Sequence, residues 1–171
     1  MDYTLDKAQK VIEKLKLQEH PEGGYFKETY RSEALIPHDS LVGNFKGDRN
    51  ISTAIYFMLT SEMFSAFHKV EQDELWHFHF GSSIELHTIS PEGIHATHII
   101  GNDIMNGEQP QLTVEGGDWF CAKVKDSNSF SLVSCTVAPG FDFRDFILPS
   151  KDEMVKLFPQ HETIISEFTR H

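Results

Sequence analysis

The chain has 171 residues, 39% of them hydrophobic and 12% aromatic, which suits one domain with a substantial core and leaves no room for a second. Its 26 acidic residues outnumber the 15 basic ones, for a formal net charge of −11, and no Lys or Arg cluster could neutralise a run of phosphates, which argues against nucleic-acid binding. The first ten residues lack an apolar stretch of the signal-peptide type, and the longest apolar run, residues 54–59, is too short to span a bilayer, so we expect a cytoplasmic protein without membrane contact.

The chain begins with helical periodicity and continues with strand patterns. Residues 5–17 predict a helix that covers one end or face of a sheet, with an apolar stripe of Leu5, Ala8, Val11, Ile12 and Leu15. From residue 25 to residue 146 short strand-like runs alternate with turn-rich breaks such as 90–93 and 115–118, a spacing typical of a barrel or sandwich. Residues 150–153 have the capping-box pattern, which predicts a short helix through residue 157, and Pro159 begins a second helix.

The two cysteines are predicted to be free. Cys121 and Cys135 lie on two runs that read as a hairpin with its turn near Ser127, and folding about that turn sets Cys121 opposite Val133. We therefore expect no disulfide, two small core residues and a reducing compartment.

Residues 64–81 carry the densest set of candidate site residues. The segment reads as adjacent strands over 64–70 and 75–80, joined by a polar turn at 71–73. Strand alternation sends Glu74, Trp76, Phe78 and Phe80 to one face, and it sends Leu75, His77 and His79 to the other. Glu74 and the two histidines therefore cannot share a pocket unless a bulge intervenes.

Each residue of this segment has a chemical and a structural interpretation. His68 is our first choice for a general base or a metal ligand, against a hydrogen-bonded histidine in a mixed core. A buried Glu74 would cost free energy without a partner or ligand, which makes it a candidate site residue. The alternative is that its carboxylate lies at the turn and stays exposed to water. His77 and His79 could together bind one metal ion. The alternative is that their face packs against another sheet or subunit, and we favour it for His79.

Residues 20–32 form a second polar segment, with Glu22, Tyr25, Glu28 and Arg31 around a Gly-Gly pair. The Tyr25 phenol would serve as an acid if it points inward. The alternative is an edge strand whose Glu28 and Arg31 form a solvated or intersubunit ion pair. His20 precedes a proline, and we give a turn role the same weight as a ligand role. Further along, residues 138–141 are predicted to shape a pocket rim, with Phe141 and Phe143 lining apolar space.

The spacing around His68 resembles the first motif of the cupin superfamily, a barrel family whose motif pairs two histidines with a glutamate and a glycine. His68, Glu74 and Gly81 occupy three of those positions, and Val70 stands at the second histidine. The second cupin motif would start at Gly117, which puts Lys123, Lys125 and Asn128 at its Pro, Gly and His positions. The usual metal-binding histidines of both motifs are therefore incomplete.

A closer resemblance spans nearly the whole chain. Five ordered blocks, at residues 20–32, 52–59, 64–68, 73–81 and 136–146, are similar to those of a small, functionally uncharacterised cupin group. The resemblance implies an all-β fold: a cupin-type antiparallel β-barrel, or jelly roll, in a single domain over residues 1–171, with an N-terminal helix and short C-terminal helices. It also implies a homodimer.

Three hypotheses for function follow from the residues and the resemblance. The preferred one is a barrel that binds a small metabolite and acts as a metal-independent epimerase or isomerase, because cupin sugar-nucleotide epimerases use a histidine base and a tyrosine acid. His68 would be the base, Tyr25 the acid, and Glu74 would position or polarise the base. The pocket is predicted to be lined by Glu22, Arg31, Trp76, His77, Phe78, Trp119 and Phe141.

The other two hypotheses keep the barrel and change the chemistry. A metal-dependent oxygenase or isomerase would hold a divalent transition metal with His68, Glu74 and either His77 or His79. A non-enzymatic metabolite-binding or storage-like barrel would bind without turnover. The residues by themselves specify no cofactor.

Overall fold

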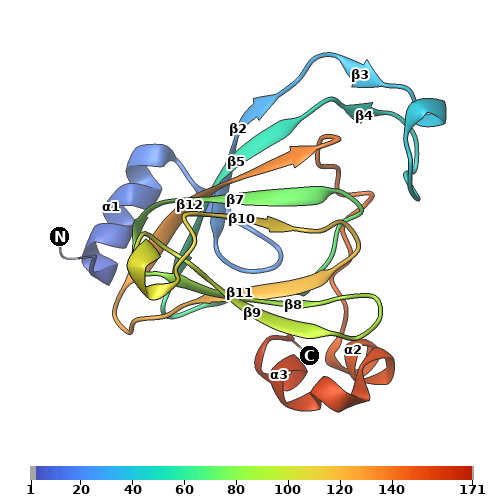
Figure 1. The fold of residues 1–171 in the computed structure, drawn as a ribbon. Coiled ribbons are helices and arrows are strands. Elements are labelled where there is room, and N and C mark those ends of the chain that lie inside the picture. The colour runs from blue at the N-terminus through green and yellow to red at the C-terminus, as the bar shows by residue number, and fades with distance from the viewer. Residues whose placement is uncertain (1–2, 171) are drawn as a thin grey trace.

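The strand patterns form two antiparallel sheets that face each other in the computed structural model, which describes residues 3–170 (Figure 1). The larger sheet has six strands in the spatial order β1 (Gln18–Glu19), β2 (Tyr25–Arg31), β5 (Thr53–Thr60), β12 (Phe130–Ala138), β7 (Asp73–Gly81) and β10 (Gln111–Val114). The smaller sheet has four, in the order β6 (Phe64–His68), β11 (Trp119–Val124), β8 (Ile84–Ile89) and β9 (His95–Ile100). The expected cupin-type jelly roll is confirmed.

Helices and a projecting arm surround the two sheets. The helices are α1 (Leu5–Leu15), α2 (Lys151–Leu157) and α3 (Glu162–Glu167), with single 3-10 turns η1 (His38–Ser40), η2 (Ile104–Asn106) and η3 (Pro159–His161). The arm is built on the short strands β3 (Leu35–Ile36) and β4 (Arg49–Asn50) and extends away from the sheets beyond β2 and β5 (Figure 1). No helix within residues 3–170 is long and apolar enough to cross a membrane.

The helix ends follow local sequence signals. α1 begins at Leu5 as expected and stops two residues earlier than predicted, because Lys16 adopts a left-handed conformation with φ 57°. Ser150 caps α2 through the predicted capping box, in which its hydroxyl accepts from the Glu153 backbone N–H.

Two pairs of consecutive strands lie in different sheets, contrary to the hairpins expected from the sequence. β6 pairs with β11 while β7 pairs with β12 and β10, so the turn after His68 carries the chain across the barrel. β11 and β12 are separated in the same way. Cys121 consequently faces outward from the smaller sheet and Cys135 faces inward from the larger one, and both are free.

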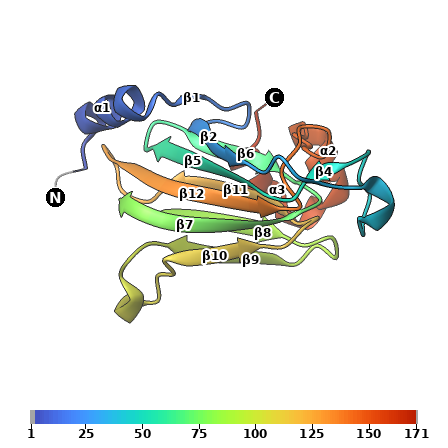
Figure 2. The same cartoon turned by 90° about the horizontal axis from the view of Figure 1, so that it is seen from above.

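Apolar side chains cover both faces of each sheet. The inner faces enclose a core that includes Phe57, Trp76, Phe120 and Val133. α1 packs on the outer face of the larger sheet, and α2 and α3 pack beneath the smaller one (Figures 1 and 2). Alternation along each strand therefore serves two apolar layers, one inside the barrel and one under a helix.

Two β-bulges reset the alternation at positions that matter for the site. In β2 the register against β5 shifts between Glu28 and Tyr30, so Arg31 joins Glu28 on the inner face. In β7 the register against β12 shifts after Phe78, which turns Phe80 outward toward α1. The prediction that Phe80 shares a face with Glu74 was therefore wrong.

A buried ion pair fastens the arm to the barrel. The Arg49 guanidinium, 1% exposed, donates through Nε to Asp145 Oδ2 at 2.7 Å and contacts the other carboxylate oxygen through Nη2. Gln72 donates to the same Asp145 Oδ2 at 2.8 Å. The loop after β12 is thereby held between the arm and the start of β7, where it borders the inner cavity.

The packing of the C-terminal helices predicts the effect of removing one ring. Phe168 is 1% exposed and packs edge-on against Phe64 and Phe67. We expect Phe168→Ala to lower the free energy of unfolding by about 3–5 kcal/mol, because it leaves a cavity between α3 and the smaller sheet. Urea unfolding followed by circular dichroism measures the loss. The exposed Leu157→Ala serves as the control, and an equal loss in both variants would contradict this account.

Candidate functional site

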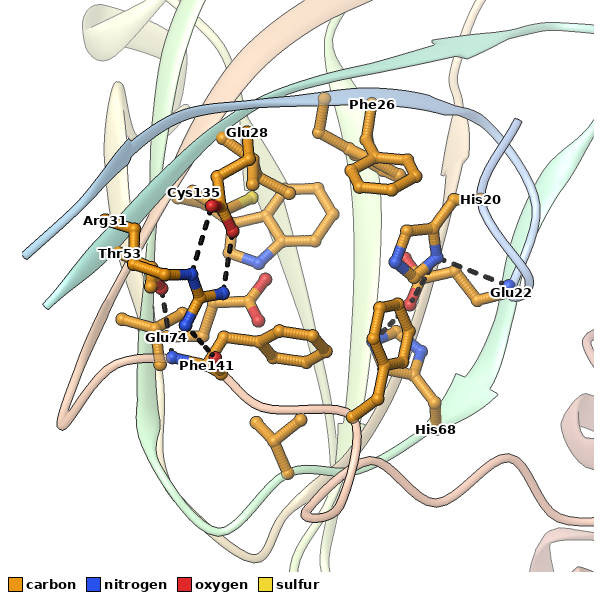
Figure 3. A pocket seen from close by; sticks show the side chains of 16 residues that line it. His20, Glu22, Phe26, Glu28, Arg31, Thr53, His68, Glu74, Cys135 and Phe141 are labelled. Atoms are coloured by element: carbon orange, nitrogen blue, oxygen red, sulfur yellow. Dashed lines mark hydrogen bonds and ion pairs between the residues drawn. The ribbon is translucent and has the colours of Figure 1, made fainter. Parts of the chain in front are cut away.

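A cavity lies between the two sheets at the end of the barrel bordered by the loop after β12 (Figure 3). It leaves about 70 Å³ for the centres of water-sized molecules, which is enough for several waters or a small metabolite. Its lining contains three carboxyl groups, two imidazoles, one guanidinium and mostly apolar walls: His20, Glu22, Phe26, Glu28, Arg31, Thr53, Ile55, Phe57, His68, Val70, Glu74, Trp76, Cys135, Val137, Phe141 and Phe143.

A tight turn before β2 brings Glu22 into the cavity. Gly23 stands at φ 108°, and a Cβ there would lie 2.2 Å from the Phe64 carbonyl oxygen, so only glycine allows this close approach to β6. The Ala66 N–H donates to the Glu22 carbonyl at 2.8 Å and fixes the turn on β6. The Glu22 side chain is thereby held among the inward-facing groups of that strand.

Glu22 and His68 form a buried pair. Nδ1–H of His68 donates to the Ala66 carbonyl at 2.7 Å, and its Nε2 lies 2.9 Å from Glu22 Oε2. Ser65 Oγ donates to the other carboxylate oxygen at 2.8 Å. Burial opposes the charge on both groups, but their mutual attraction and hydrogen bond outweigh it, so the pKa of Glu22 is lowered and the pKa of His68 is raised. The pair is a carboxylate and an imidazolium.

His20 stands beside this pair as a neutral imidazole. Its Nδ1 lies 3.3 Å from the Glu22 backbone nitrogen and 3.5 Å from Glu22 Oε2, and in the tautomer that accepts from the backbone N–H the ring proton is on Nε2. Burial lowers the pKa of His20, and His68 lowers it further against the opposing effect of Glu22. The Nε2–H makes no hydrogen bond within residues 3–170 and is therefore available as a donor.

Glu74 occupies the wall opposite His20, Glu22 and His68 (Figure 3). Burial, followed by the negative charge of Glu22, raises the pKa of Glu74 to about 7, although His68 acts in the opposite direction. Next to it along the inner face of β7, the Trp76 indole is 1% exposed, and the Trp76 and Cys135 side chains interact with the Glu74 carboxyl group and act to lower its pKa. Glu74 is thus a carboxyl group that gains and loses a proton near neutral pH.

Arg31 and Glu28 mark the mouth of the cavity, where the lining side chains reach solvent. The guanidinium donates to the Glu28 carboxylate through Nε at 3.0 Å and through Nη2 at 2.7 Å. Its Nη1 donates to Asn50 Oδ1 at 2.8 Å and to the Phe141 carbonyl at 3.1 Å. Arg31 therefore joins β2, β4 and the loop after β12 at this opening.

The structure brings together six of the site residues predicted from sequence. Four of them carry ionisable side chains and two are aromatic: His68, Glu74, Glu22, Arg31, Trp76 and Phe141. His20 and Glu28 were left outside the predicted lining and belong to it. Their place in the same turn and strand as Glu22 and Arg31 was the signal that could have found them.

Four other predicted site residues lie elsewhere, and each has a structural reason. Tyr25 packs with the cluster under α1, because Phe26 and Glu28 take the inward positions of β2. His77 faces outward, where its Nε2 lies 2.9 Å from Thr136 Oγ1. Phe78 packs on the core between the sheets, and Trp119 lies under the C-terminal helices with the Lys69 ammonium 5.0 Å above its ring. The Tyr25 side chain therefore does not point inward, which was the condition for its proposed role as an acid.

The proposed metal ligands do not converge. His68 and Glu74 line the cavity, but His77 is on the opposite face of β7, and His79 is bonded to Ser134 on that same outer face. Val70 lines the cavity at the position of the missing motif histidine. Among residues 3–170 no three His, Cys, Asp or Glu side chains are arranged to hold an ion. These residues do not fit a catalytic metal, which usually takes three protein ligands.

Comparisons with known proteins place this chain in a family. The chain belongs to the cupin superfamily, because residues 9–149 match the family described as Cupin superfamily (DUF985). The uncharacterized protein YML079W of Saccharomyces cerevisiae is 33% identical over 159 residues, which cover 87% of this chain and 79% of the yeast protein.

Two solved structures share the architecture over almost their whole length. A hypothetical protein from Leishmania major has a TM-score of 0.88 and 33% identity, covering 96% of this chain and 99% of that one. Protein SO0799 from Shewanella oneidensis has a TM-score of 0.85 and 36% identity, covering 99% of both chains. None of the three descriptions assigns a reaction, so the function has to be argued from the cavity.

The raised pKa of Glu74 predicts a pH-dependent contribution to stability. The folded protein binds the Glu74 proton up to about pH 7, whereas the unfolded chain releases it near pH 4.5. Stability relative to Glu74→Gln should therefore fall by about 3 kcal/mol in total as the pH rises from 4.5 to above 7. Urea unfolding of both proteins at pH 5 and pH 8 measures this difference. A difference that is the same at both pH values would show that Glu74 ionises normally.

The Glu22–His68 pair predicts a second pH-dependent contribution to stability. In Glu22→Gln a buried imidazolium loses its carboxylate, at a cost of about 3–5 kcal/mol between pH 4.5 and pH 6.5, where Glu22 would be ionised and His68 would be charged in the unfolded chain as well. The raised pKa of His68 stabilises the wild type most in that range, so the cost should shrink as the pH rises through the folded pKa. Denaturation midpoints at pH 5 and pH 9 test this, with the half-exposed Glu28→Gln as the control.

Proposed function

We propose that this cupin binds a small carbonyl compound in the cavity and moves a proton on it without a metal, as an isomerase or epimerase. The observation that carries the proposal is Glu74, a buried carboxyl group with a pKa of about 7 in a small, largely apolar cavity. A general base or acid works best when its pKa lies near the working pH, and burial and neighbouring charges are the usual means of placing it there.

His68 has a different role from the one predicted. Both of its ring nitrogens are engaged by the protein, one by the Ala66 carbonyl and one by Glu22, so neither is free to take a proton from a ligand. Its contribution is to hold the Glu22 charge in place. That fixed negative charge helps to keep the proton on Glu74 up to neutral pH.

The proton transfer can be written with the groups that face the cavity. The Glu74 carboxylate takes a proton from the carbon next to the carbonyl, and the C–H electron pair becomes the double bond of an enolate. The negative charge that develops on the oxygen is stabilised by the His20 Nε2–H donor. On a substrate with a hydroxyl group on the deprotonated carbon, the hydroxyl proton moves to the enolate oxygen and the protonated Glu74 returns its proton to the former carbonyl carbon. The former hydroxyl oxygen becomes the new carbonyl oxygen, which completes an isomerisation.

Epimerisation requires a proton donor on the other side of the same carbon. Tyr25, the predicted donor, lies outside the cavity. His20 lies on the wall opposite Glu74 and would have to supply that proton instead (Figure 3). One poised carboxyl group is sufficient for an isomerase, so isomerisation is the simpler form of the proposal.

The test is solvent exchange at carbon. Pyruvate, dihydroxyacetone and glyceraldehyde are incubated with the protein in D₂O, and deuterium incorporation is followed by proton NMR. We expect exchange that rises with an apparent pKa near 7 and falls by about 10²-fold or more in Glu74→Gln, because a positioned general base contributes about that much.

The exposed Glu115→Gln is the matched control and should leave the exchange rate unchanged. Exchange that survives in Glu74→Gln would remove Glu74 from the mechanism. Saturable binding of these compounds without exchange would replace the enzyme proposal with a barrel that binds a metabolite and does not transform it.

A further inference from the structure

The mouth of the cavity carries its single guanidinium group, and this group already holds a carboxylate. Arg31 contacts both oxygens of Glu28 with its Nε and Nη2 edge. Two neutral acceptors, Asn50 and the Phe141 carbonyl, hold Nη1 and fix the plane of the guanidinium. The edge that faces Glu28 is therefore a preformed bidentate site for a planar carboxylate.

Glu28 itself is a replaceable occupant of that site. Its side chain is 41% exposed, and its carboxylate has no hydrogen-bond partner other than Arg31 in the described chain. A half-exposed pair of this kind contributes little to stability, since water solvates both groups well when they separate. Glu28 can therefore turn into solvent without leaving another protein group unpaired.

Charge balance favours an anionic ligand that exchanges with Glu28. Glu22 and Glu28 each already pair with a cationic side chain of the lining, His68 and Arg31, so no unpaired cation remains there for a further anion. A ligand carboxylate that replaces Glu28 on Arg31 leaves the charge near the guanidinium unchanged. The rest of the ligand then extends inward along apolar walls toward Glu74.

We infer that the substrate is a small 2-oxo carboxylic acid, whose carboxylate displaces Glu28 from the Nε and Nη2 edge of Arg31 while its carbonyl carbon lies in the cavity. Arg31 is the residue that sets this specificity, and Glu28 is an internal competitor for the same edge. The inference rests on the proposed function only in taking this cavity as the substrate site.

The experiment measures binding of pyruvate and of pyruvamide, its neutral isostere, by isothermal titration calorimetry. We expect the acid to bind about tenfold or more tightly than the amide, because only the acid pairs with the guanidinium through two charged hydrogen bonds. Glu28→Gln should bind pyruvate severalfold more tightly than the wild type, since the competing charge is gone. Arg31→Gln should lose the preference for the acid and keep the same affinity for the amide.

A second arginine offers matched controls. Arg144 holds Asp142 through Nε at 2.9 Å and Nη2 at 2.7 Å, the same bidentate arrangement outside the cavity. Arg144→Gln and Asp142→Asn should change neither affinity. The expected result for Glu28→Gln is a gain in affinity for pyruvate, which a folding defect could not produce. If the Arg31–Glu28 pair had only a structural role, Glu28→Gln would not bind pyruvate more tightly.

Several outcomes would overturn the inference. Equal affinity for acid and amide, unchanged pyruvate binding in Glu28→Gln, or no saturable binding by 2-oxo acids from pyruvate to 2-oxohexanoate would each do so. Deuterium exchange is read separately. If carboxylates bind in a way that depends on Arg31 but no deuterium exchange occurs, this inference stands and the enzyme proposal is rejected. If neutral carbonyl compounds exchange deuterium at the same rate with and without Arg31, the enzyme proposal stands and this inference is rejected.

Discussion

The buried pair between Glu22 and His68 is the interaction on which the interior of this barrel depends. It holds the turn before β2 against β6, where Gly23 allows the two backbones to approach closely. It also places a negative charge inside the cavity. Burial first and that charge second raise the pKa of Glu74 to about 7, although His68 acts in the opposite direction. One hydrogen-bonded ion pair therefore shapes the wall of the cavity and contributes to the acidity of the group across from it.

The same strands line the cavity with their inner faces and pack against the helices with their outer faces. Each sheet is apolar on both faces, because α1 covers the larger sheet and the C-terminal helices cover the smaller one. The polar groups of the cavity come from a few inward positions near one end of the barrel, whereas the inward positions further along carry the hydrophobic core. The protein can thus bury ionisable groups without dividing its core.

Strand alternation, helical periodicity and capping patterns are local signals, and they predicted a barrel or sandwich with terminal helices. The jelly roll was implied by the resemblance to the cupin superfamily, and six of the residues proposed for the site line the cavity. Sequence reasoning failed where the outcome depends on distant contacts. Tyr25 and Phe26 are both aromatic, and alternation alone cannot say which of them faces the cavity when both faces of β2 are covered. Whether consecutive strands such as β6 and β7 pair or cross between the sheets is also decided by partners far along the chain. Both bulges escaped prediction for the same reason.

The position of the bulge in β2 decides which side chain faces the cavity mouth. With the extra residue in place, a guanidinium faces inward and the phenol of Tyr30, which is 55% exposed, faces solvent. Plain alternation through all the residues of the strand would turn Tyr30 inward and Arg31 outward. Deleting Thr29, the extra residue, would remove the bulge and leave both side chains on their present faces. The cationic entrance therefore depends on where this strand absorbs one residue, and a shift of that position would change the ligand preference without remodelling the core.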